Sequence, residues 1–413
     1  MSGFFRSRWV DRPEYVTEIE SGALPAGFQA AGVACGLKPG GQLDLALIHS
    51  EEPETTSAAR FTTNARVGAP VALSRRARLH GLRAVVANSG GSNTGDGARG
   101  DETAAAMQAR AAELLGLEPE QVGVASTGVI GSELPRQTVL DGLGAARDAL
   151  GPDAGPVARA ILTSDAGPKH AALEVALPGG TVRLSAQAKG AGMISPRFAT
   201  MFCFVQTDAG LAAETTDLLT GVCVKRSFDR ISVDGQLSTS DTVFLQASGA
   251  SGVRVQPESE DELLLGGALD ALMRQLAIEI VADGEGCDRV GRIVVRGSPA
   301  QAGRVARAVA DSPLVKTALH GADPNYGRIL QAAGAVMDPG DGFTADLEIE
   351  GVRLVTGGDV VVLDAAGLAD VQDKMHGTEV DMTLTLPGEG GEAEVFFSDL
   401  SQEYVSFNAE YTT

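Results

Sequence analysis

Short apolar stretches alternate with amphipathic ones through the first half of the chain. Residues 84–88 (AVVAN) predict a buried strand, which runs into a glycine-rich turn at 89–100. Residues 101–116 predict a helix, with Asp101 as its N-terminal cap and Gly116 as its stop signal. A strand ending in a tight turn is expected at 122–131, and a second helix at 136–150. This alternation indicates a mixed α/β fold.

The second half repeats the mixture less evenly. We expect strands around LEVALP and TVRLSA, a helix over 207–224, and strands around RISVDG and TVFLQASG. The long amphipathic stretch 260–284 predicts another helix. A strand at 291–297, a helix at 300–312 and several later strands suggest a smaller C-terminal α/β domain over about 289–395.

Composition agrees with this picture. A chain of 413 residues fits two or three packed units, and its 44% hydrophobic residues supply their cores. With 52 glycines and only 4% aromatic residues, we expect many tight turns and cores built from Ala, Val and Leu.

The charge balance narrows the choice of partners. The formal net charge of −21 repels phosphate backbones and anionic membranes, so we expect no nucleic-acid or membrane partner. Small molecules are therefore the expected ligands. No apolar run approaches the roughly 20 residues of a membrane helix, and the N-terminal stretch lacks a signal peptide's apolar region. These features predict a cytoplasmic protein.

Candidate metal and nucleotide motifs are absent from the sequence. The four cysteines form no CxxC pair, so buried thiols are expected instead of a zinc site or a disulfide framework. The five histidines are scattered, with no pair at metal-ligand spacing. The turn at 89–100 matches neither GxxxxGK[ST] nor GxGxxG in register. The sequence therefore predicts no metal and no nucleotide cofactor.

The most informative stretch is KGAGMISPRFATMFCFVQTDA at 189–209, where glycines and a proline precede Ala199-Thr200 and an apolar run follows. Taken alone, it reads as a turn feeding a buried strand. It closely resembles the autoproteolysis site of the ornithine acetyltransferase (bifunctional glutamate N-acetyltransferase) family, in which the bond before the matching threonine is cut. The co-linear segments that also fit are STGVIGSELP at 126–135, SFDRISVDGQLSTSDTVFL at 227–245, SPLVKTALHGADPNYGRI at 312–329 and DLSQEYVSFNAEYTT at 399–413.

The resemblance implies cleavage between Ala199 and Thr200, which gives an α chain of residues 1–199 and a β chain of residues 200–413. Thr200 would then be the nucleophile. Its new α-amine, which ordinarily titrates at about 7.7–8.0, would be the base that takes the hydroxyl proton. Thr127 and Gly128 would form the oxyanion hole, the first by side chain or backbone and the second through its N–H.

Substrate-binding residues also follow from the resemblance. It assigns Lys189, Glu285, Asn408 and Thr413 to this role, and Lys189 and Glu285 have charges that suit the carboxylate and amine of an amino acid. Further candidates near the substrate are Thr163, Ser164 and Ala166, with Asn88 and Asn93 as secondary polar contacts.

The implied activity is transfer of acetyl from N-acetylornithine to glutamate through an acetyl-Thr200 intermediate. No cofactor is needed, and acetyl-CoA is an alternative acetyl donor in the family. The implied fold is an αββα-type layered sandwich formed by both chains, assembled as an α2β2 heterotetramer.

Two places depart from the family pattern. Ala166 stands where a hydroxyl residue commonly follows Asp165, and Cys287-Asp288-Arg289 replaces the usual Ala-Thr-Lys. Both departures are expected near the substrate pocket, where they would alter hydrogen-bond geometry. They leave open a paralogue that acts on another amino acid or on a specialised-metabolite amine. A self-cleaving amidase or aminopeptidase, with water as acceptor, is a further alternative.

Overall fold

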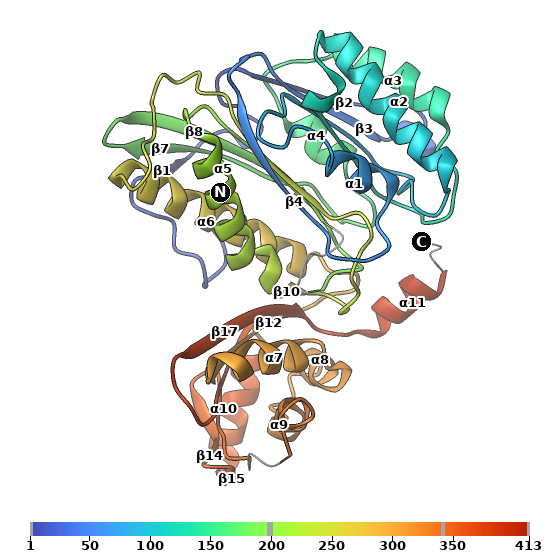
Figure 1. Ribbon diagram of the computed structural model, residues 1–413. Coiled ribbons are helices and arrows are strands. Elements are labelled where there is room, and N and C mark those ends of the chain that lie inside the picture. Colours follow the sequence, from blue (N-terminus) through green and yellow to red (C-terminus); the bar gives the residue numbers. More distant parts are fainter. Residues whose placement is uncertain (1–2, 196–200, 340–342, 411–413) are drawn as a thin grey trace.

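The computed structural model describes residues 3–195, 201–339 and 343–410. It contains three sheets with helices packed against them, so the predicted mixed α/β class is confirmed (Figure 1). The six-stranded sheet has the order β1 (Val16–Glu18), β7 (Lys169–Leu177), β8 (Gly180–Lys189), β9 (Phe202–Thr207), β11 (Thr242–Ala247) and β4 (Thr56–Phe61). The four-stranded sheet has the order β2 (Phe28–Val33), β3 (Leu45–Ser50), β5 (Ala84–Asn88) and β6 (Val122–Ser126).

These two sheets lie face to face, and helices cover the outer face of each. Helices α1 (Ala69–Ser74), α2 (Ala98–Leu115) and α3 (Arg136–Asp148) pack on the four-stranded sheet, and α5 (Ala213–Arg226) and α6 (Glu260–Ala282) on the six-stranded one. The short helix α4 (Gly155–Ala160) instead contacts both sheets and contributes to the core between them. Short 3-10 turns occupy Pro39–Gly41, Pro119–Gln121 and Phe228–Arg230.

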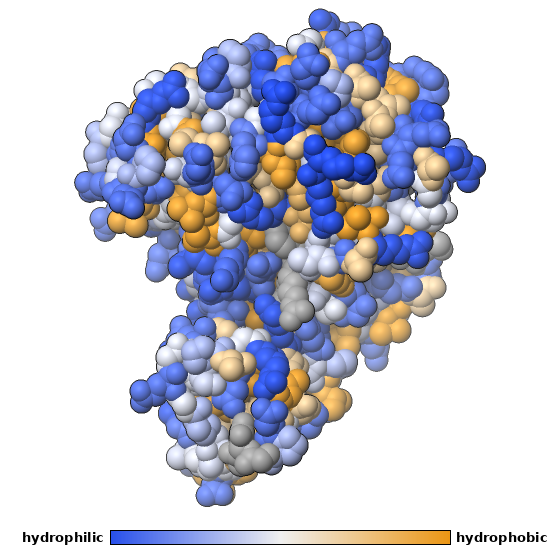
Figure 2. Space-filling model, viewed as in Figure 1, coloured by the Kyte–Doolittle hydropathy of each residue, from blue (hydrophilic) through white to orange (hydrophobic). Residues whose placement is uncertain are grey.

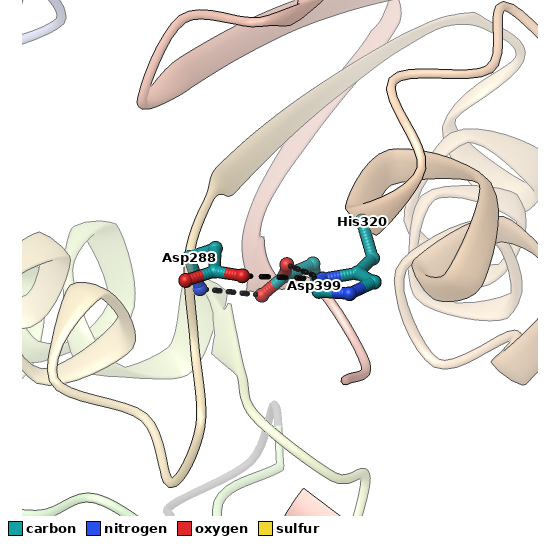
Figure 3. Close-up of side chains that lie close together, drawn as sticks. All are labelled: Asp288, His320 and Asp399. Atoms are coloured by element: carbon teal, nitrogen blue, oxygen red, sulfur yellow. Dashed lines mark hydrogen bonds and ion pairs between the residues drawn. The ribbon is translucent and has the colours of Figure 1, made fainter. Parts of the chain in front are cut away.

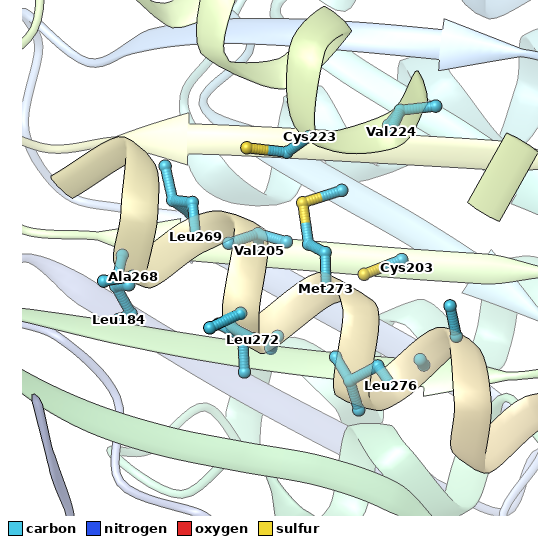
Figure 4. Packing of buried hydrophobic residues seen from close by; sticks show 14 of the residues in the cluster. Leu184, Cys203, Val205, Cys223, Val224, Ala268, Leu269, Leu272, Met273 and Leu276 are labelled. Atoms are coloured by element: carbon cyan, nitrogen blue, oxygen red, sulfur yellow. The ribbon is translucent and has the colours of Figure 1, made fainter. Parts of the chain in front are cut away.

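The layers follow from the alternation of side chains along each strand. In β9, Cys203 and Val205 point to the core beneath α5 and α6, whereas Phe202 and Phe204 point to the core between the sheets. Leu269, Leu272 and Met273 of α6 lie over the first of these cores (Figure 4). Side chains of β3 and β5 alternate in the same way between the inter-sheet core and the core under α2 and α3. The order of layers is helix, sheet, sheet, helix.

A third, seven-stranded sheet has a hydrophobic core of its own and lies below the main body (Figure 1). Its order is β10 (Ile231–Ser232), β17 (Gly391–Ser398), β12 (Val290–Gly297), β16 (Glu379–Thr385), β13 (Asp346–Ile349), β14 (Val352–Thr356) and β15 (Asp359–Val360). The later helices are α7 (Pro299–Ala310), α8 (Pro313–His320), α9 (Tyr326–Gly334), α10 (Ala365–Met375) and α11 (Gln402–Glu410). From this sheet, α11 returns towards the main body.

Strand β6 ends at Ser126, before the turn at Gly128, as predicted for a strand ending in a tight turn at 122–131, whereas two other predicted boundaries are wrong. Helix α2 begins at Ala98 after Gly97, whose φ of +58° breaks the preceding turn, so Asp101 lies inside the first turn and is not the cap. The helix predicted over 207–224 begins only at Ala213, because Thr207 still belongs to β9.

The face of the molecule shown in Figure 2 is mostly hydrophilic, with hydrophobic residues between the charged ones. Within the described residues, no helix has the length and apolar character needed to cross a membrane. All four cysteines are free; Cys203 and Cys223 are buried, and the other two are partly buried.

Candidate active site

A cavity of about 340 Å³ lies where several strands and helices of the main body end and α11 returns. Segments far apart in the sequence line it: the turn after β6, the segment after α4, the loop before β11 and one side of α11. The lining residues central to its chemistry are Thr127, Gly128, Thr163, Ser164, Glu285 and Asn408. These are residues that the family resemblance selected, so the fold brings them together at one concave site.

The turn at Thr127 and Gly128 presents hydrogen-bond donors to this cavity. The backbone N–H of Thr127 donates to the Asn88 carbonyl at 3.0 Å, so only the threonine hydroxyl remains to act as a donor. Gly128 has φ of +124°, and a Cβ there would lie 2.7 Å from the Gly91 nitrogen. Within the described part of the chain, the Gly128 N–H has no acceptor. The turn therefore offers one hydroxyl and one backbone N–H.

Lys189 lies behind this turn instead of lining the cavity. Its side chain is fully buried, and Nζ donates to the Thr127 hydroxyl oxygen at 3.2 Å and to that of Thr163 at 2.8 Å. Because Thr127 Oγ1 accepts this bond, its own proton is directed elsewhere and is available to a ligand. Burial lowers the pKa of Lys189, although the nearby Asp165 carboxylate opposes this effect.

Asp165, Lys169 and Asp283 form a charge cluster next to Lys189. Lys169 Nζ lies 2.8 Å from Asp165 Oδ1 and 2.5 Å from Asp283 Oδ2. The Asp165 carboxylate also accepts the Gly190 N–H at 2.7 Å, directly after Lys189 in the chain. Burial would raise the pKa of Asp165, but Lys189 and Lys169 together hold it well below its usual range. Asp165 therefore carries a charge that fixes the end of β8.

The opposite wall is acidic and includes α11. Asn408 Nδ2 donates to Glu285 Oε2 at 2.8 Å. Tyr404 directs its hydroxyl to Asp234 Oδ2 at 3.3 Å, and Asp234 also accepts the N–H groups of Met193 and Ile194 at 2.7 and 2.8 Å. Burial, followed by the charges of the nearby Asp234 and Glu285, raises the pKa of Tyr404. The C-terminal helix is thus part of the cavity.

Other predicted residues lie elsewhere. Ala199, Thr200 and Thr413 lie outside the described residues. Asn88 and Asn93 are buried and hydrogen bond to the loop they belong to, and neither lines the cavity. Ala166 also lies outside the lining, and its N–H donates to the Asp283 carboxylate.

Residues 287–289, the second departure from the family pattern, are not among the residues that line the cavity, although Glu285, two positions earlier, is. His320 Nδ1 lies 2.8 Å from Asp399 Oδ2 and 3.4 Å from Asp288 Oδ2 (Figure 3). Arg289 donates to the His320 carbonyl, and the Cys287 thiol donates to the Arg289 carbonyl. These contacts join α8 and the end of β17 to the segment after Glu285. They therefore connect the C-terminal sheet to the main body.

The sequence reasoning missed several residues at this site. Asp165 and Lys169 lie within LTSDAGPK, where their opposite charges four residues apart were the available signal. Tyr404 and Asp234 lie within segments that carried the resemblance, but only the fold brings α11 onto the loop before β11. Asp241 ends the polar run STSD before an apolar strand and is fully buried.

Comparisons with known proteins find relatives over nearly the whole chain. The ArgJ family model matches residues 29–413. The chain is 42% identical over 399 residues to the arginine biosynthesis bifunctional protein ArgJ of Symbiobacterium thermophilum, covering 94% of this chain and 98% of that protein. The protein of the same name from Nitratidesulfovibrio vulgaris is 41% identical over 397 residues, covering 94% of this chain and 99% of the relative.

Two solved structures are also similar to this chain in sequence. The crystal structure of the Bacillus halodurans protein of that name is 29% identical, with a TM-score of 0.47, and the match covers 51% of this chain and 98% of that one. The Mycobacterium tuberculosis ornithine acetyltransferase, solved with ornithine, is 33% identical, with a TM-score of 0.41 and coverage of 45% and 99%. The match of the family model over residues 29–413 and the identities over nearly the full length establish that this chain belongs to the ArgJ family.

Proposed function

We propose that this protein is a bifunctional glutamate N-acetyltransferase that cuts itself between Ala199 and Thr200. It then transfers acetyl from N-acetylornithine to glutamate by a ping-pong mechanism. The observation that carries the proposal is the turn at Thr127 and Gly128, whose hydroxyl and N–H groups face a cavity beside the start of β9. Acetyl-CoA serves as an alternative acetyl donor, and no cofactor is needed.

In the first half-reaction, the Thr200 hydroxyl oxygen attacks the acetyl carbonyl, and the Thr200 α-amine takes the hydroxyl proton. The developing oxyanion accepts hydrogen bonds from the Gly128 N–H and the Thr127 hydroxyl, each worth about 3 kcal/mol in the transition state. The C–N bond then breaks, the proton passes to the departing nitrogen, and ornithine leaves an acetyl ester on Thr200. The amine of glutamate attacks this ester in the second half-reaction.

The cavity wall supplies groups for binding an amino acid. The Glu285 carboxylate pairs with a substrate ammonium group, and Asn408 holds this carboxylate in place from α11. Lys189 acts through the hydroxyls of Thr127 and Thr163, since its Nζ lies behind them. Ser164 and Thr413 provide further polar contacts, whereas Ala166 lies outside the lining and its N–H donates to the Asp283 carboxylate.

Both products of cleavage remain in one molecule. Strand β8 belongs to the α chain, residues 1–199, and β9 to the β chain, residues 200–413; they pair from Lys189 opposite Phe202 to Leu184 opposite Thr207. The layered body is then an αββα sandwich built from both chains, with residues 289–395 as the smaller domain. We expect two such αβ units to form an α2β2 heterotetramer.

The placement of the family departures favours ornithine and glutamate over another amine acceptor. Ala166 and residues 287–289 do not line the cavity, so neither of the two departures noted in the sequence changes a lining residue. A paralogue with a changed acceptor would need substitutions that face the ligand.

Intact-mass measurement and N-terminal sequencing of the wild type beside Thr200→Ala test the proposal. We expect the wild type to give two fragments, the second beginning at Thr200, and the variant to stay one chain of 42.4 kDa without transfer activity. Incubation with N-acetylornithine and a panel of amines should give acetylglutamate. An uncut active wild type, free acetate without an acceptor, or acetylation of a different amine alone would each reject the proposal.

A further inference from the structure

Three side chains of metal-ligating type meet where the C-terminal sheet joins the main body. His320 Nδ1 lies 2.8 Å from Asp399 Oδ2 and 3.4 Å from Asp288 Oδ2 (Figure 3). One possible ligand atom from each residue lies within 4.8 Å of the other two. None of the three residues is among those that line the active-site cavity. The scattered histidines of the sequence offered no sign of this cluster, which only the fold assembles.

The spacing suits a single ion. Zinc binds imidazole nitrogen and carboxylate oxygen at about 2.0–2.2 Å, so two ligands of one ion are about 2.8–3.6 Å apart, from octahedral to tetrahedral geometry. The two separations from His320 Nδ1, 2.8 and 3.4 Å, fall in this range. The same spacing also suits a proton on Nδ1 that the two carboxylates share, and an ion would replace that proton.

The fold fixes two of the ligands before any ion binds. The Asp399 side chain is fully buried, and its Oδ1 accepts the Asp288 N–H at 3.0 Å, which directs Oδ2 towards His320. His320 is the last residue of α8, and its carbonyl accepts a hydrogen bond from the Arg289 guanidinium. Ligating carboxylates in proteins are typically held in this way by a hydrogen bond to the oxygen that does not bind the metal.

Asp288 is the ligand that the family pattern lacks. The usual residue at its position is threonine, which offers no carboxylate. The Asp288 side chain is 62% exposed and that of His320 37%, so water reaches the cluster and can complete the coordination of an ion.

Two neighbouring cations oppose an ion, but both are engaged elsewhere. The Arg289 guanidinium donates to the His320 carbonyl, and Lys316 Nζ donates to the Ser398 carbonyl. The carboxylates of Asp288 and Asp399 offset these two charges. Without Asp288 the surroundings would carry a net positive charge, so binding should depend strongly on this exposed carboxylate.

We propose that Asp288, His320 and Asp399 bind one divalent transition-metal ion, with Zn²⁺ as the best fit. Imidazole together with carboxylate suits zinc, whereas magnesium and calcium take oxygen ligands. The ion is structural and takes no part in acetyl transfer. It ties α8 and the end of β17 to the segment after Glu285, and so holds the C-terminal sheet against the main body. The inference does not depend on the proposed activity.

Metal titration of the whole protein tests this. Wild type stripped with a chelator is titrated with Zn²⁺ by calorimetry, and with Co²⁺ by visible absorption, which reports the ligands directly. We expect one Zn²⁺ per chain and a higher temperature of thermal unfolding when Zn²⁺ is bound. Asp288→Thr, which restores the usual family residue at an exposed position, should bind Zn²⁺ about 100-fold more weakly or worse. His320→Gln should lose binding to a similar extent.

Asp323→Asn and His376→Gln are the matched controls, because each removes an exposed acid or histidine outside the cluster. Both should bind Zn²⁺ and be stabilised by it as the wild type is. Absence of saturable binding by the folded wild type, or unchanged binding by Asp288→Thr and His320→Gln, would overturn the inference. Failure of the proposed function would appear separately, as an uncut or inactive wild type whatever its metal content.

Discussion

Gly128→Ala is the sharpest test of the proposed oxyanion hole, because the structure supplies a matched control in the same loop. A Cβ at Gly128 would lie 2.7 Å from the Gly91 nitrogen and 2.8 Å from the Gly90 carbonyl carbon, both backbone atoms. Gly131 also has a positive φ, +82°, but a Cβ there would meet no atom within 4 Å.

The cost of each change can be worked from these contacts. Both alanines adopt a left-handed conformation, which costs roughly 1–2 kcal/mol. Only Gly128→Ala also overpacks the loop, which adds about 1–3 kcal/mol. The loop cannot yield easily, since the Gly91 N–H donates to the Thr127 carbonyl at 3.1 Å. The turn must therefore move, and the N–H of residue 128 moves with it.

Displacement of one oxyanion donor costs about 10²–10³ in kcat, so we expect a loss of this size in Gly128→Ala. Gly131→Ala should keep its rate within a few fold. Initial rates of acetylglutamate formation, with intact mass to follow self-cleavage, measure both variants. If Gly128→Ala cleaves and transfers acetyl at the rate of Gly131→Ala, the N–H of Gly128 is not an oxyanion donor.

Two further changes probe the charges behind the cavity. Lys189→Met leaves an unbranched side chain one atom shorter, without the ammonium group that donates to the hydroxyls of Thr127 and Thr163. We expect kcat/KM to fall about 100-fold while thermal unfolding still shows a folded protein; wild-type kinetics would refute this role. Asp165→Asn, made in the uncut Thr200→Ala background so that unfolding involves one chain, should lower the free energy of unfolding by about 3–5 kcal/mol at pH 7, because it breaks a buried pair with Lys169. Because the pKa of Asp165 is lowered in the folded state, its charge stabilises the fold fully above the unfolded pKa of about 3.9, and this stabilisation is lost as the pH falls further. In urea denaturation, the difference in free energy of unfolding between the background and the Asp165→Asn variant should therefore be smaller near pH 3 than at pH 7.

Local patterns were sufficient for the long elements. Strand β5 has the predicted bounds, and α3 and α6 end within two residues of theirs. Helix α6 also begins with a side-chain N-cap, since Ser259 Oγ accepts the Glu262 N–H. Errors arose where the backbone conformation of one residue sets a boundary that the residue types do not indicate. Gly97 has a positive φ, and α2 begins directly after it, three residues before the predicted cap Asp101.

The site could be predicted only in part. Motif resemblance selected Thr127, Gly128 and Glu285, which the fold brings to one cavity. It also selected Lys189 as a direct ligand contact, but the structure buries this side chain behind two hydroxyls. Asp241 had no signal beyond its motif, because its contact with the Met201 N–H depends on which strand pairs with β9.

The same pairing explains how a chain can be cut beside its active site without losing the new terminus. Every residue of β9 from Phe202 to Thr207 is buried, and β8 and β11 hydrogen bond to its two edges. Cleavage before Thr200 would free one end of the strand but leave these ladders intact. The start of β9 would then stay between the end of β8 at the buried Lys189 and the start of β11 at Thr242, directly after the buried Asp241.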